Sequence, residues 1–183
     1  MKVSDYIFRF LKEHGVKEAF MLPGGGAMHL DDSLGRSGIH YTCFLHEQAA
    51  GIAAEAYGQL TNTPGVVVVT SGPGATNAIT PVVAGYIDST PMFILSGQSK
   101  RADLVEDRGV RQIGSQEVNT VALVKNITKY AVEIIEPETI RYHMERAWET
   151  AVGGRPGPVW ISVPLDVQAC NVDPENMMGY HPV

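Results

Sequence analysis

Apolar runs of strand length alternate along the chain with stretches in which apolar residues recur at helical spacing. The runs that predict strands cover residues 16–22, 39–45, 66–70, 91–95, 130–135 and 159–163. A first helix is predicted to be capped by Ser4 or Asp5 and to end at Gly15. Further helices are predicted at residues 27–34, 48–60, 75–86, 118–126 and 137–152. Such alternation is typical of βαβ units, so we expect an α/β fold, a three-layer sandwich with a mostly parallel six-stranded sheet and helices on both faces.

Glycine-rich and polar segments fall where the predicted strands end. The segment 23–26 follows the first strand, His46 and Glu47 follow the second, and the turn at 71–74 follows the third. Ligands of parallel sheets bind at the carboxyl ends of the strands, so these segments are expected to share a site. The polar segment 99–116 predicts a long loop, and loops of this length in compact domains are often functional.

Length and composition predict a single globular domain. The chain has 183 residues, 44% of them hydrophobic, which is enough to bury a core without disulfides or structural metal ions. We expect residues 1–168 to form this domain and the polar segment 169–183 to be a tail or a linker towards another domain. Cys43 and Cys170 lie too far apart in sequence to suggest a disulfide framework, so a reducing cytoplasm is the expected location.

Charge and hydropathy argue against two classes of partner. The formal net charge is −6 and no basic run occurs, whereas a binder of the phosphate backbone needs clustered cations, so no nucleic acid partner is expected. The first fifteen residues lack the apolar core of a signal peptide, and the longest aliphatic run, 66–69, is too short to cross a bilayer. No membrane partner is expected.

Glu47 is the best candidate for chemistry, but its position alone allows two interpretations. A glutamate at a strand-to-helix junction commonly complements the helix N-terminus, and it can equally be an acid presented at the edge of the sheet. The glycines are no clearer, because His29 stands where the Rossmann fingerprint needs its third glycine and no Walker A motif occurs, which leaves tight turns as the simpler explanation. The histidines are scattered without zinc spacing, so no metal ligands are predicted in this chain.

Several segments, taken together and in order, resemble the acetolactate synthase branch of the thiamine-diphosphate enzymes. The matching segments are Pro23-Gly24-Gly25, His46-Glu47-Gln48-Ala49-Ala50, Thr70-Ser71-Gly72-Pro73-Gly74-Ala75-Thr76-Asn77, Asp88 to Pro91 with Gly97-Gln98, Gln116-Glu117, Gly154-Arg155-Pro156-Gly157-Pro158 and Val163-Pro164-Leu165-Asp166-Val167. They span nearly the whole chain, and the resemblance implies the fold of the pyrimidine-binding (PYR) domain of these enzymes.

The resemblance also implies roles for individual residues. Glu47 would promote the imino tautomer of the aminopyrimidine ring of thiamine diphosphate, and Gln116 would face the reacting end of the cofactor, which makes these two the expected catalytic residues. The expected cofactor-binding residues are Pro23, Gly24, Gly25, Glu47, Thr70, Pro73 and Asn77. The implied activity is that of a transferase or lyase that decarboxylates a 2-oxo acid and joins the product to an acceptor.

The resemblance further implies partners and groups that this chain does not hold by itself. The diphosphate and Mg²⁺ are expected on a domain with a GDG motif, in the same or another chain. The assembly is expected to be a homodimer or homotetramer, and the full-length protein could also bind FAD. This chain alone is therefore expected to be inactive. Two departures, Leu22 before the glycines and Ser115 before Gln116, leave the 2-oxo acid and the acceptor open.

Two alternatives remain open at this point. One is the PYR subunit of a two-chain 2-oxo acid decarboxylase resembling phosphonopyruvate or sulfopyruvate decarboxylase. The other is a non-catalytic binding module of the same fold, against which the intact Glu47 argues, since folding does not require an acid at this position.

Overall fold

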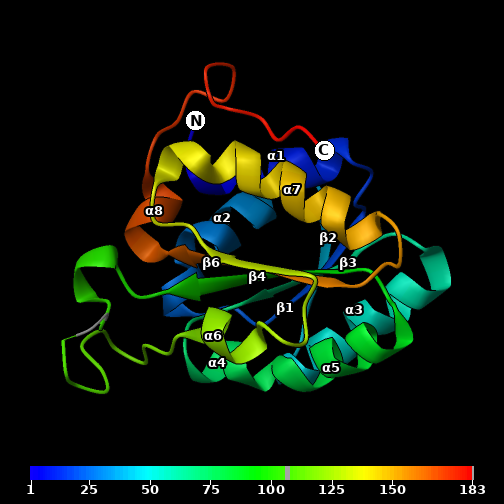
Figure 1. The fold of residues 1–183 in the computed structure, drawn as a ribbon, viewed down its shortest axis with the longest axis horizontal. Coiled ribbons are helices and arrows are strands. Elements are labelled where there is room, and N and C mark those ends of the chain that lie inside the picture. The colour runs from blue at the N-terminus through cyan, green and yellow to red at the C-terminus, as the bar shows by residue number, and fades with distance from the viewer. Residues whose placement is uncertain (106–107, 183) are drawn as a thin grey trace.

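A computed structural model describes residues 1–105 and 108–182 of the chain. Its centre is a six-stranded sheet in which all paired strands run parallel, in the order β2-β1-β3-β4-β6-β5. The strands are β1 (Glu18–Met21), β2 (His40–Cys43), β3 (Gly65–Val69), β4 (Met92–Gln98), β5 (Tyr130–Glu133) and β6 (Pro158–Pro164). The expected three-layer α/β sandwich is confirmed (Figure 1).

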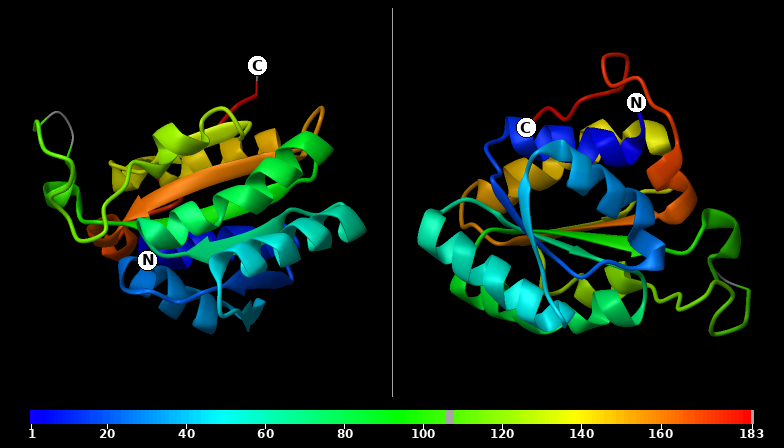
Figure 2. Two further views of the ribbon diagram at one scale, coloured as in Figure 1. Left: turned by 90° about the horizontal axis from the view of Figure 1, so that it is seen from below. Right: turned by 180° about the vertical axis from the view of Figure 1, so that it is seen from behind.

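Helices cover both faces of this sheet, as Figure 1 shows and the two views of Figure 2 repeat. One face carries α1 (Val3–Glu13), α2 (Met28–Ser37), α7 (Ile140–Val152) and α8 (Leu165–Ala169), and the other carries α3 (Glu47–Thr61), α4 (Pro73–Asn77), α5 (Ile79–Asp88) and α6 (Thr120–Val124). Short 3-10 turns are η1 (Gly25–Ala27), η2 (Arg101–Asp103) and η3 (Pro137–Thr139). In the part of the chain that the structure describes, no helix is both long and apolar enough to span a membrane.

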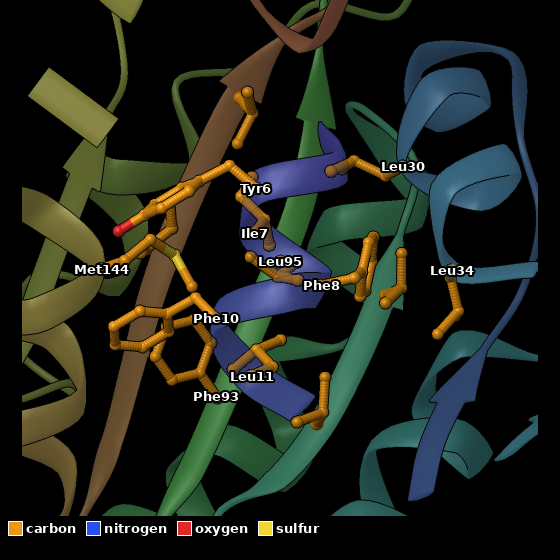
Figure 3. Packing of buried hydrophobic residues seen from close by; sticks show 14 of the residues in the cluster. Tyr6, Ile7, Phe8, Phe10, Leu11, Leu30, Leu34, Phe93, Leu95 and Met144 are labelled. Carbon is orange, nitrogen blue, oxygen red and sulfur yellow. The ribbon is translucent and has the colours of Figure 1, made fainter. Parts of the chain in front are cut away.

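The strand β3 has no polar position because both of its faces are buried. Successive side chains of a strand point to opposite faces, and here Val66 and Val68 join the core beneath α1 while Val67 and Val69 join the core beneath α3 and α5. The apolar stripe of α1 fills the first of these cores, with Phe8 and Leu11 fully or almost fully buried, and Figure 3 shows it packed between α2 and α7. Both faces of the sheet are therefore covered at its central strands β3, β4 and β6, whereas the edge strand β2 is exposed along its length.

Three details of the helices differ from expectation. The helix α1 begins at Val3 after Lys2, so Ser4 and Asp5 lie inside its first turn and do not cap it; both side chains instead engage Ser33 of α2. The single helix expected at 75–86 is interrupted at Ala78, which separates α4 from α5. The short helix α8 follows β6 directly in a segment for which no helix was predicted.

The segment after α8 runs back along the α1 and α7 face of the domain. Val3 N–H donates to Cys170 O at 2.9 Å, and Val172 N–H donates to Met1 O at 2.8 Å. Further on, Tyr180 N–H donates to a carboxylate oxygen of Glu145 in α7 at 2.6 Å. The domain boundary expected at residue 168 stays a prediction.

Candidate functional site

The carboxyl ends of β1 and β3 bring two turns into direct contact. Thr70 directly follows β3, and its Oγ1 accepts a hydrogen bond from Gly26 N–H at 3.0 Å. Gly24 comes so close to the same side chain that a Cβ on it would lie 2.4 Å from Thr70 Cβ. The strand β4 lies directly against the turn that contains Gly26, because a Cβ on Gly97 would lie 2.1 Å from Gly26 O. The glycines at 24 and 97 therefore serve close backbone approach, which any larger residue would prevent.

Glu47 is the first residue of α3 and is only 8% exposed. The helix N-terminus is capped by its neighbour, because His46 Nδ1 accepts the Gln48 N–H at 3.1 Å. Asn77 at the end of α4 donates from Nδ2 to Glu47 Oε2 at 3.0 Å, across 30 residues of sequence. The carboxylate is therefore held by a side chain from another helix, which a simple helix-start acid does not need.

The turn after β3 places Gly74 beside this carboxylate. A Cβ on Gly74 would lie 3.1 Å from Glu47 Oε1 and 2.6 Å from Thr70 Cγ2. Gly72 in the same turn has a left-handed φ of 56°, and a Cβ there would lie 1.8 Å from Gln116 O. Thr70 and the turn thus connect Glu47 on one side with the glycines of η1 and with Gln116 on the other.

A cavity of about 420 Å³ opens at this edge of the sheet. The residues that line it are Gly24, Gly25, Gly26, Thr70, Ser71, Gln98, Ser99, Lys100, Asp103, Ser115, Gln116 and Leu165. The expected site residues Gly24, Gly25, Thr70 and Gln116 thus meet in one cavity. Glu47 and Asn77 adjoin it through Thr70 and Gly74, and Pro23 and Pro73 are exposed beside the two turns.

Two further residues of this region were not singled out from the sequence. Gln98 is buried at the end of β4, where its Nε2 donates to Val118 O at 2.9 Å and so ties the long loop to the sheet. Asp31 of α2 accepts the Gly24 N–H on Oδ2 at 3.1 Å, and burial raises the pKa of this carboxyl to about 6 while that hydrogen bond lowers it. Gln98 stood in the quoted Gly97-Gln98 pair, whereas no motif in the sequence pointed to Asp31.

The long loop expected at 99–116 is confirmed as a connection without strands in its described part, and it projects beyond the carboxyl ends of the strands (Figure 1). Residues 106–107 of this segment lie outside the described residues. Glu117 organises the end of the loop, since its carboxylate accepts from the backbone N–H groups of Ile113 and Gly114, each at 3.2 Å. Within 1–105 and 108–182, no group of three or more His, Cys, Asp or Glu side chains is arranged to hold a metal ion.

Comparison with known proteins finds a family match over most of the chain. The family described as thiamine pyrophosphate enzyme, N-terminal TPP binding domain, matches residues 1–123. The chain is 41% identical over 171 residues to the mitochondrial acetolactate synthase of Schizosaccharomyces pombe, a match that covers 92% of this chain and 24% of the relative. It is 39% identical over 184 residues to the acetolactate synthase large subunit of Lactococcus lactis, covering 97% of this chain and 31% of that protein. The probable acetolactate synthase large subunit of Methanocaldococcus jannaschii is 37% identical over 190 residues, a match that covers 100% of this chain and 31% of that protein.

Proposed function

This chain belongs to the thiamine pyrophosphate enzyme family, whose N-terminal TPP-binding domain it forms, and we propose that it supplies the pyrimidine half of a catalytic site in an acetolactate synthase-like enzyme. The chain spans 24% to 31% of the length of the three relatives described above, so the activity of a whole enzyme is part of this proposal. The proposed reaction is decarboxylation of a 2-oxo acid followed by carboligation.

The single observation that carries the proposal is the buried carboxylate of Glu47 held by Asn77. An aminopyrimidine ring is flat and carries nitrogen atoms at its edge, so it suits a narrow space with one acidic partner. A Cβ on Gly24 or Gly74 would collide with Thr70, so both turns pack closely on this side chain, and the cavity opens next to them. The residues present therefore fit the cofactor's pyrimidine ring.

Each proposed site residue has a distinct task. The bound cofactor supplies the carbon nucleophile and the electron sink of the reaction, while the protein supplies binding and proton control. Asn77 orients Glu47 through Oε2, which leaves Oε1 to hold a proton shared with a ring nitrogen. Gln116 stands at the cavity that adjoins the ring and would orient the substrate there.

The cofactor-binding wall is proposed to comprise both turns. Pro23, Gly24 and Gly25 would form one side, and Thr70 and Pro73 would form the other; of these, Gly24, Gly25 and Thr70 line the cavity. The conformation of these turns depends on close backbone contacts, so the pocket is expected to be formed before the cofactor binds.

The remaining half of the site is proposed to lie on a diphosphate-binding domain that holds Mg²⁺, in the same or another chain. Exposed apolar side chains before and along α3 support such an assembly, because Leu45 is 100% exposed and Ile52 and Leu60 of α3 are 51% and 85% exposed. A homodimer or homotetramer in the cytoplasm, acting on a small 2-oxo acid, completes the proposal, with FAD left open. The relatives' names favour this interpretation over the two-chain decarboxylase and over a non-catalytic module.

The test is Glu47→Gln in the assembled enzyme, with turnover of a 2-oxo acid as the readout. We expect a loss of about 100-fold or more, because removal of a general acid–base group typically costs that much. Glu55→Gln is the matched control on the same helix, since Glu55 accepts hydrogen bonds from Gln59 and Thr90 outside the site, and it should stay within about twofold of the native rate. Equal rates for the two variants would refute the role of Glu47.

A further inference from the structure

The glycine turn at the cavity is fastened by three separate side chains. Thr70 Oγ1 accepts from Gly26 N–H at 3.0 Å, and the fully buried Gln168 donates from Nε2 to Gly26 O at 2.7 Å. The third fastening is Asp31, whose Oδ2 accepts from Gly24 N–H at 3.1 Å. Threonine and glutamine are neutral, so Asp31 is the charged member of this set.

The charge of Asp31 is poorly compensated. Among the described residues it forms no ion pair, and its Oδ1 is buried without a hydrogen-bond partner. Its neighbour Asp32 shows the contrast, because that exposed carboxylate binds Lys2 at 3.0 Å and Arg36 at 2.8 Å. An asparagine at 31 could accept the same hydrogen bond from Gly24 without burying a charge, so stability alone does not account for an acid here.

We propose that Asp31 is a positioning residue for the cofactor pocket, whose carboxylate fixes the Gly24 amide so that the turn lies against Thr70. The inference rests on the proposed function and extends it to a residue outside the cavity wall. A hydrogen bond to an ionised acceptor is stronger than one to a neutral acceptor, so the charge favours one orientation of the peptide between Pro23 and Gly24. Since Gly24 packs directly on Thr70, a rotation of that peptide would move the pocket wall itself.

Amide hydrogen exchange on the 183-residue chain tests the local part of this inference. In Asp31→Ala we expect the amides of residues 24–27 to exchange about tenfold faster or more, while the amides of β3 and α1 keep their native rates. Asp32→Ala is the matched control, because it removes the adjacent exposed acid and should leave residues 24–27 unchanged. Native exchange at residues 24–27 in Asp31→Ala would overturn the inference.

Thiamine diphosphate affinity in the assembled enzyme tests the functional part. Asp31→Asn keeps the volume and the acceptor, so we expect it to bind the cofactor at least threefold more weakly while its stability is unchanged or higher; Asp31→Ala should weaken binding about tenfold. A purely structural residue would not lower affinity in a variant of undiminished stability. Native affinity in Asp31→Asn overturns the inference even where Asp31→Ala does not fold.

The same titrations separate this inference from the proposed function. Unchanged cofactor affinity in both Glu47→Gln and Asn77→Ala would refute the proposed site, and hydrogen exchange at residues 24–27 would still decide whether Asp31 holds the turn. Weakened affinity in those two variants together with native affinity in Asp31→Asn would refute the role of Asp31 alone.

Discussion

Replacing Asp31 with Asn should stabilise the folded chain at neutral pH. Burial raises the pKa of this carboxyl from 3.8 to about 6, so the folded state binds its proton more tightly than the unfolded state does. The contribution of this tighter proton binding to the free energy of unfolding is fully present below about pH 4 and is lost as pH rises from about 4 to about 6. A shift of this size corresponds to about 3 kcal/mol at most, and partial exposure of Asp31 reduces the expectation to about 1–3 kcal/mol.

Urea unfolding at pH 4, 5, 6 and 7 measures this difference directly. The free energy of unfolding of Asp31→Asn should match the native value near pH 4 and exceed it progressively, by about 1–3 kcal/mol at pH 7. Asp32→Asn is the control and should lower the free energy of unfolding instead, since hydrogen bonds from Arg36 and Lys2 hold the pKa of Asp32 well below its ordinary value. A difference for Asp31→Asn that is constant with pH, or negative at pH 7, would contradict the burial of an uncompensated charge.

Three other substitutions test separate parts of the structure. Gly74→Ala should lower stability by about 1–3 kcal/mol and weaken cofactor binding, because the new Cβ would lie 3.1 Å from Glu47 Oε1; unaltered calorimetric affinity would contradict the geometry. Trp160→Phe should cost about 1–3 kcal/mol in urea unfolding, since it leaves Ser96 Oγ buried without its 2.9 Å donor, and a smaller loss in a Ser96→Ala background would identify that bond. Asn62→Gly should raise the thermal midpoint by about 1–3 °C, because Asn62 ends α3 with a left-handed φ of 54°; a lower midpoint would refute this.

The strands and most helices followed from local periodicity, because a strand covered on both faces must be apolar throughout and an amphipathic helix must repeat its apolar residues. Helix ends were less predictable. Ser4 looked like a cap but binds Ser33 of α2, since the approach of another helix offered its hydroxyl a different partner. The interruption at Ala78 was likewise invisible in a pattern that stays apolar through it.

The alternating elements, the parallel sheet and the motifs at its carboxyl edge could be predicted from the sequence, because each depends on the order and spacing of residues close together in the chain. The contacts of the acids at that edge became visible only in the folded chain. His46 caps α3, so Glu47 is free to meet Asn77, and Asp31 holds Gly24 at the cavity. Burial and hydrogen-bond partners are set by which distant elements approach a side chain, and local periodicity does not encode that approach.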